Sequence, residues 1–157
     1  MSRQDNASSS SMEFPKPSPT LKRLERLVGT WELSGRTLGA AEDNIRGRIT
    51  IQWLPGGFFL EQRGEIEVGG FKVQSLEIVG YDSATDTFPA YVYSNLGESH
   101  MLYHWDVQGD VVTHWTSGSK YTGSFNEDGT ILAGGWRPDA GVEQNDGNTY
   151  DATMTRV

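Results

Sequence analysis

One carboxylate interrupts an apolar run of the sequence and could do acid–base chemistry. Glu77 lies between Leu76 and the apolar pair Ile78 and Val79. A carboxyl group that is withdrawn from water can serve as an acid, a base or an anchor for a ligand. A glutamate on the solvent face of a strand gives the same local pattern, so both orientations of Glu77 are open at this stage.

Two of the three histidines could form a second kind of site. His104 and His114 lie on segments joined by a turn at Gln108-Gly109, and one register sets them opposite each other, within reach of one metal ion. However, alternation places His104 on the opposite face from Tyr103 and Trp105, which favours an outward, solvated position. The chain has no cysteine, so thiolate ligands and disulfides are excluded. We therefore expect neither a bound metal nor another cofactor.

The motifs of common enzyme and nucleotide sites are absent from the sequence. It has no Gly-x-Ser-x-Gly elbow, no Walker loop, no Gly-x-Gly-x-x-Gly after a strand and no His-Glu-x-x-His. Thirteen Lys and Arg residues against 21 Asp and Glu residues give a net charge of −8, which disfavours nucleic acid and anionic membranes as partners. No apolar signal region or stretch of ~20 apolar residues is present, and we expect a cytoplasmic protein.

The elements that must position these side chains are mostly short β-strands. Residues 1–19 are rich in Ser and Pro and poor in apolar side chains, so we expect a disordered N-terminal tail, followed by one domain over 20–157. Thr20 is predicted to cap a short helix over 21–28, whose leucines share one face. Runs of β-branched and aromatic residues between Gly, Asn and Asp then predict about ten strands, at 31–38, 45–54, 58–68, 71–81, 88–95, 99–107, 110–117, 120–126, 130–137 and 148–157.

Short sequential strands with tight turns are typical of an all-β, antiparallel up-and-down barrel, which leaves no edge strand exposed; a β-sandwich is the alternative. Alternation along each strand predicts which side chains face the interior. These side chains either line a small-molecule cavity or fill a solid core. The residues that we expect at a ligand site are Trp53, Leu60, Gln62, Glu77, Tyr93, Tyr103, Trp105 and Trp115.

Gly29-x-Trp31 at the helix-to-strand junction and Arg156 in the last strand predict a structural clasp, with the Arg over the face of the Trp ring at one barrel end. This pair resembles the structural signature of the calycin superfamily, which includes the lipocalins, fatty-acid-binding proteins and avidins. The segments Leu54-Pro-Gly-Gly-Phe-Phe-Leu-Glu-Gln62 and Ile78-Val-Gly-Tyr-Asp-Ser-Ala-Thr85 resemble a bacterial lipocalin-like family of unknown function. The resemblance covers about residues 21–157 and implies a barrel with a central cavity.

These observations favour a non-catalytic module that carries or sequesters a small hydrophobic molecule inside the barrel. The alternative is an enzyme such as a cyclase or isomerase, in which the cavity folds a substrate and Glu77, Tyr93 or Tyr103 moves a proton. Haem is a minor alternative, because nitrobindin-type barrels have a similar first strand and ligate haem through a histidine near the C-terminus. No histidine follows His114 in this chain.

Overall fold

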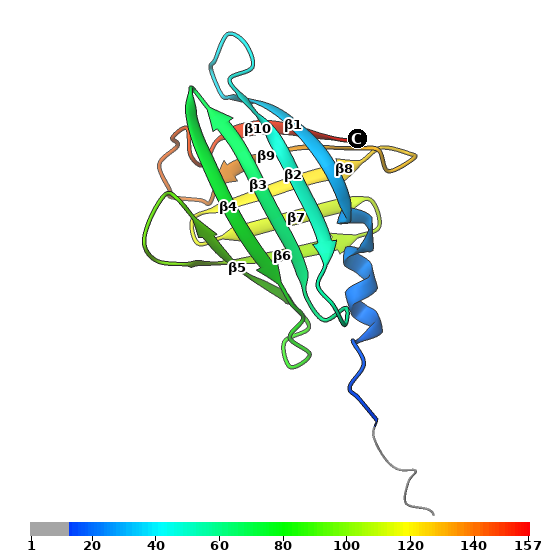
Figure 1. The fold of residues 1–157 in the computed structure, drawn as a ribbon. Helices are drawn as coiled ribbons and strands as arrows, with labels where there is room; N and C mark the ends of the chain where they lie inside the picture. Colours follow the sequence, from blue (N-terminus) through cyan, green and yellow to red (C-terminus); the bar gives the residue numbers. More distant parts are fainter. Residues whose placement is uncertain (1–12) are drawn as a thin grey trace, which may run out of the picture.

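Ten antiparallel strands close into a barrel in the computed structural model, which describes residues 13–157 (Figure 1). Each strand pairs with its neighbours in sequence, and β1 pairs with β10 to complete the ring. The predicted fold class, an all-β antiparallel up-and-down barrel with a short N-terminal helix, is confirmed. The strands are β1 (Gly29–Thr37), β2 (Ile45–Trp53), β3 (Leu60–Val68), β4 (Phe71–Val79), β5 (Phe88–Ser94), β6 (Met101–Gln108), β7 (Val111–Thr116), β8 (Ser119–Phe125), β9 (Ile131–Pro138) and β10 (Tyr150–Arg156).

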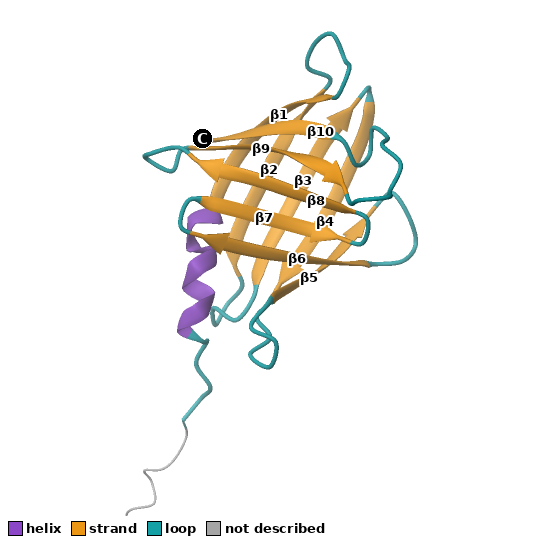
Figure 2. Cartoon of the chain, turned by 180° about the vertical axis from the view of Figure 1, so that it is seen from behind, coloured by secondary structure: helices purple, strands orange, loops and turns teal. Residues whose placement is uncertain are grey.

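The 3₁₀ helix η2 (Pro19–Leu27) precedes the barrel and lies against one end of it (Figure 2). The side chain of Ser18, and not of Thr20 as predicted, caps this helix by accepting a hydrogen bond from the Thr20 backbone N–H at 3.2 Å. Pro19 fits the first helical position because its ring already fixes a helical φ. The three leucines of η2 are buried. Residues 1–12 of the predicted tail lie outside the described residues.

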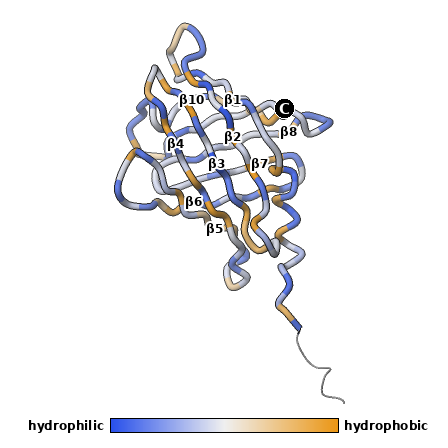
Figure 3. Tube along the Cα trace, viewed as in Figure 1, coloured by the Kyte–Doolittle hydropathy of each residue, from blue (hydrophilic) through white to orange (hydrophobic). Residues whose placement is uncertain are grey.

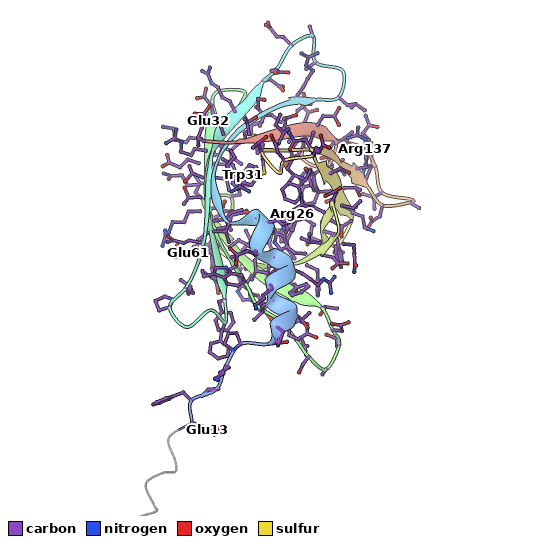
Figure 4. The ribbon with its side chains drawn as sticks, turned by 90° about the vertical axis from the view of Figure 1, so that its right-hand side faces the viewer. Glu13, Arg26, Trp31, Glu32, Glu61 and Arg137 are labelled. Atoms are coloured by element: carbon purple, nitrogen blue, oxygen red, sulfur yellow. The ribbon has the colours of Figure 1, made fainter. Side chains whose placement is uncertain are left out.

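A clasp between Trp31 and Arg156 joins the first and last strands. Trp31 lies on β1 close to the end of η2 (Figure 4). The guanidinium carbon lies 4.2 Å from the centroid of the fully buried indole ring. The same guanidinium donates hydrogen bonds to the backbone oxygens of Arg26, Val28 and Gly129, while the indole N–H donates to the Leu27 oxygen at 2.9 Å. The clasp thus ties η2, β1 and β10 together at one end of the barrel.

Hydrophobic and hydrophilic residues alternate along parts of the strands (Figure 3). Because successive side chains of a strand point to opposite faces, this alternation separates an apolar interior from a polar outer wall. Alternation predicts Ile49 and Ile51 on the interior face of β2 and Leu60 on that of β3, and all three residues are buried. In β3 the charged residues on the other parity form outer-wall contacts such as the Arg63–Glu61 ion pair. The interior faces of these strands therefore follow directly from the alternation in the sequence.

Strand β7 is turned the opposite way from the prediction. Val112 is fully buried and His114 faces the interior, whereas Val111 is exposed. The reason is the turn before β7: its two residues are Gly109 and Asp110, so that Gln108 pairs with Val111. Because cross-strand partners share a face, a two-residue turn places the even-numbered residues of β7, Val112 and His114, on the interior face of Trp105. The predicted interior position of Trp115 together with Trp105 would require a loop with an odd number of residues.

Candidate functional site

The barrel interior has a sealed end and a hollow end. Buried side chains of η2 and of the adjoining strand ends, among them Leu24, Trp31 and Phe88, fill the sealed end. Beyond them lies a cavity of about 240 Å³ whose walls include residues of all ten strands. Its aromatic and polar lining residues are Gln62, Ser75, Glu77, Ser94, Tyr103, Trp105, His114, Tyr121, Trp136 and Tyr150. The remaining walls are aliphatic side chains and methionines.

Glu77 lies where the cavity meets the packed core. Its neighbours on the same face of β4 are Ser75, which lines the cavity, and Val79, which belongs to the core. Only 3% of the glutamate is exposed. The interior orientation of Glu77, one of the two left open by the sequence, is therefore the one observed.

Three side chains from three strands converge on the Glu77 carboxylate. Gln62 Nε2 donates to Oε1 at 3.1 Å, and Trp105 Nε1 donates to Oε2 at 2.7 Å. His114 Nε2 lies 2.9 Å from the same Oε2. Gln62 is the cross-strand partner of Glu77, and Trp105 is the cross-strand partner of His114. Two register pairs on opposite sides of β5 thus meet in the interior as one polar cluster.

With Glu77 ionised and His114 neutral, the contact between the two side chains selects one tautomer of the imidazole. An indole N–H can only donate, so Oε2 serves as an acceptor, and an ionised carboxylate accepts every bond in this arrangement. His114 Nε2 then carries the ring proton and donates a hydrogen bond to Oε2. In the neutral ring Nδ1 holds the lone pair, and it has no hydrogen-bond partner within residues 13–157. The cluster therefore offers one unused acceptor on a histidine that lines the cavity.

Aromatic rings hold the imidazole in place. His114 stacks on Trp105, with ring centroids 3.8 Å apart and an interplanar angle of 16°. Tyr103 lies 5.0 Å away, and Trp136 meets the imidazole edge-on at 5.3 Å. Because the side chain of His114 is only 12% exposed, its orientation is fixed by both packing and the bond to Glu77.

Three tyrosines in the cavity wall stay protonated at neutral pH. Burial raises the pKa of Tyr103, and the negative charge of Glu77 raises it further. Burial also raises the pKa of Tyr150 to about 12, with a smaller contribution from Tyr103. Burial raises the pKa of Tyr121 in the same way. These phenols are therefore neutral groups that can form hydrogen bonds, and they contribute aromatic side chains to the cavity wall.

Half of the predicted site residues meet at the cavity. Gln62, Glu77, Tyr103 and Trp105 line it. Leu60 faces the interior but is buried in the sealed core. Trp53 lies at the η2 end, where its indole N–H donates to Glu25 at 2.9 Å.

Two predicted site residues lie on the outer wall. Tyr93 is 51% exposed beside His100, because the interior face of β5 runs through Val92 and Ser94. Trp115 stacks on His104 with centroids 5.4 Å apart, and Lys120 lies over its indole ring. His104 pairs with Trp115 in the register, so the two histidines do not face each other.

The structure adds His114, Tyr121, Trp136 and Tyr150 to the site. Tyr121 and Tyr150 both pair with Trp136 across neighbouring strands, which places the three rings on one interior face. In the sequence, Tyr121 alternates with the polar residues Lys120 and Thr122, and this pattern indicates an interior position for Tyr121. For His114 the signal is the two-residue turn at Gly109-Asp110, because it pairs His114 with Trp105 on the interior face.

Residues 13–157 contain neither a metal-binding cluster nor a membrane-spanning helix. No group of three or more His, Asp or Glu side chains in residues 13–157 is arranged to hold a metal ion. Over the same residues no helix is long and apolar enough to cross a membrane.

The fold and the site define a class of protein: a closed ten-stranded antiparallel barrel with an aromatic cavity over a buried polar cluster. Residues 16–155 match the family described as "Protein of unknown function (DUF1579)", and the chain belongs to this family. A search of curated proteins finds no match to the chain.

Proposed function

We propose that this protein binds a small, mostly apolar molecule in the barrel cavity, as a carrier or sequestering protein. The observation that carries the proposal is the cavity of about 240 Å³, which has apolar and aromatic walls and one ordered polar cluster. Pockets of this composition are typical of small-molecule sites, where a few polar groups orient the ligand. The Trp31–Arg156 clasp and the closed barrel support the resemblance to the calycin superfamily, in which the barrel interior holds the ligand.

The size of the cavity favours a compact ligand. Drug-sized molecules occupy pockets of roughly 300–1,000 Å³, and the volume here lies below that range. A single ring or a short branched chain suits it better than a long acyl chain. Haem does not suit it, because a porphyrin is too large for this volume and the Nε2 atom of His114 is already engaged by Glu77.

Titration of intrinsic fluorescence with compact cyclic compounds tests the proposal, since Trp105 and Trp136 line the cavity. The wild-type protein is expected to give a saturable change. Val92→Phe fills the cavity from β5 and is expected to abolish it, whereas Tyr93→Ser, one residue further and on the outer wall, leaves it intact. Binding that survives Val92→Phe in a folded protein, or no binding by wild type, would refute the proposal.

The contact between Glu77 and His114 favours a second candidate function, an enzyme that uses an interior base. A carboxylate that holds Nε2–H leaves the Nδ1 lone pair available to take a proton from a bound substrate. This candidate requires that a bound molecule be converted and that His114→Gln abolish the conversion. Mass spectrometry of ligands recovered unchanged after long incubation with the wild-type protein would exclude it for those ligands.

A further inference from the structure

The charges facing the cavity are unbalanced. Among its lining residues, all of which lie in the described part of the chain, Glu77 is the one carboxylate and none is Lys or Arg. Gln62 and Trp105 donate to the carboxylate as neutral groups, and His114 in its neutral tautomer does the same. In its ionised form Glu77 therefore brings a negative charge to this region that no Lys or Arg in the cavity wall balances.

The surrounding rings favour a cation in the same space. Trp136 has three tyrosine rings within reach, at centroid distances of 6.2 Å to Tyr103, 6.0 Å to Tyr121 and 6.4 Å to Tyr150. The faces of aromatic rings carry negative potential and attract ammonium groups, most strongly where water is excluded. Burial raises the pKa of Tyr103, and the Glu77 carboxylate near it raises this pKa further.

In the neutral tautomer, the Nδ1 acceptor of His114 suits a ligand that can donate a hydrogen bond. His114 Nδ1 carries a lone pair without a partner in residues 13–157. A protonated amine can donate to this atom while its charge lies in the field of Glu77. A hydroxyl group can donate but brings no charge, and a carboxylate can do neither and would be repelled by Glu77.

We propose that the cavity selects a small protonated amine that carries one compact apolar group. This inference rests on the proposed function, because it names the chemical class of the molecule that the cavity binds. The apolar group fits the aliphatic walls, and the ammonium group lies among the rings of Tyr103 and Trp136 near Glu77 and His114. An amine of this kind keeps its proton at neutral pH, as lysine does, and hence remains a cation.

Three compounds of one shape test the selection: cyclohexylmethylamine, cyclohexylmethanol and cyclohexanecarboxylate. Isothermal titration calorimetry at pH 7 is expected to rank the amine first, with an affinity roughly tenfold or more above that of the alcohol, and the carboxylate last. Glu77→Gln keeps the shape of the side chain and is expected to remove the advantage of the amine over the alcohol. Glu32→Gln, an equivalent change on the outer wall, is expected to preserve it.

The outcomes separate this inference from the proposed function. An alcohol or carboxylate that binds as tightly as the amine overturns the inference and leaves cavity binding in place. An amine preference that Glu77→Gln does not reduce also overturns it. If none of the three compounds binds, the proposed function fails for ligands of this size, and the inference fails with it. The ranking in the wild-type protein decides the matter even where Glu77→Gln does not fold.

Discussion

Glu77 Oε2 lies 2.9 Å from His114 Nε2, although β4 and β7 are not neighbours in the barrel. Strands β5 and β6 separate them along the wall, so the contact crosses the interior. It joins the two sides of the barrel at the level where the packed core ends and the cavity begins. This contact places two polar side chains at the boundary of the apolar core, and it holds both of them in the wall of the cavity.

The Glu77 cluster is expected to contribute to stability as well as to binding. Glu77→Leu should lower the free energy of unfolding by about 2–4 kcal/mol, because it leaves the buried donors of Gln62 and Trp105 without an acceptor. Urea denaturation measures the change. Glu32→Leu, which removes the solvent-exposed ion pair of Glu32 with Arg48, provides the control and should change the free energy by no more than ~1 kcal/mol. Equal effects of the two substitutions would contradict the prediction.

Loss of the clasp is expected to loosen the η2 end of the barrel. Arg156→Ala should lower the free energy of unfolding by roughly 1–3 kcal/mol, because it removes the contact over Trp31 and the hydrogen bonds to three backbone oxygens. Arg137→Ala removes an arginine whose ion pair with Asp151 is exposed, and its effect should be much smaller. A thermal melt of Arg156→Ala that coincides with the wild-type melt would count against the clasp.

Gly29 is expected to be required for the same clasp. Its φ of +143° disfavours other residues, and a Cβ atom there would clash with Nη1 of Arg156. Gly29→Ala should therefore destabilise the protein by roughly 1–3 kcal/mol. Gly97→Ala, at a loop glycine with open space around it, is the matched control and should be close to neutral in the same urea series. The prediction fails if both alanine variants unfold at the same urea concentration.

The buried tyrosines predict a loss of stability in alkali. Burial raises the pKa of Tyr150 to about 12, above the value of about 10 for an exposed tyrosine. The folded state therefore holds this proton more tightly than the unfolded state does. The stabilisation is complete below about pH 10 and is lost as the pH rises toward 12.

Unfolding by urea between pH 9 and pH 12 measures this dependence. The free energy of unfolding should fall with pH in the wild-type protein and fall less steeply in Tyr150→Phe. Tyr91→Phe, at an exposed position on the outer wall, should retain the wild-type slope. An unchanged slope in Tyr150→Phe would show that this phenol does not contribute.

The barrel could be predicted from the sequence because each turn carries its own chemical marker. Gly69 and Gly70 both adopt positive φ at the β3–β4 hairpin, and Gly129 does so between β8 and β9. Period-two alternation then gives the interior face wherever one face is charged, as in β3, where Glu65 and Glu67 alternate with Gly64 and Ile66. The fold class depends on many such signals, and an error in one of them does not change it.

The site depends on single registers, which explains why only half of it could be predicted. In β7 both faces carry aromatic or β-branched side chains, so the alternation does not distinguish His114 from Trp115. In β5 the interior face is the one with the smaller side chains, because a cavity and not a core lies beside it, and Tyr93 consequently lies outside. Hydrophobicity alone therefore identifies the wrong face in β5 and β7, where Val92, Ser94 and His114 face the cavity and the larger aromatic residues Tyr93 and Trp115 lie on the outer wall.

The last prediction follows from the observed orientation of β7, in which Trp115 lies on the outer wall. Trp115→Ala should leave the affinity for the tightest-binding compound of the cyclohexyl series unchanged, because Trp115 stacks on His104 at the outer wall. Trp136→Ala should reduce that affinity roughly tenfold or more, because it removes the ring that three cavity tyrosines surround. Calorimetry measures both affinities, and circular dichroism establishes that each variant is folded. A loss of binding in Trp115→Ala together with wild-type affinity in Trp136→Ala would mean that β7 presents its other face to the ligand in solution.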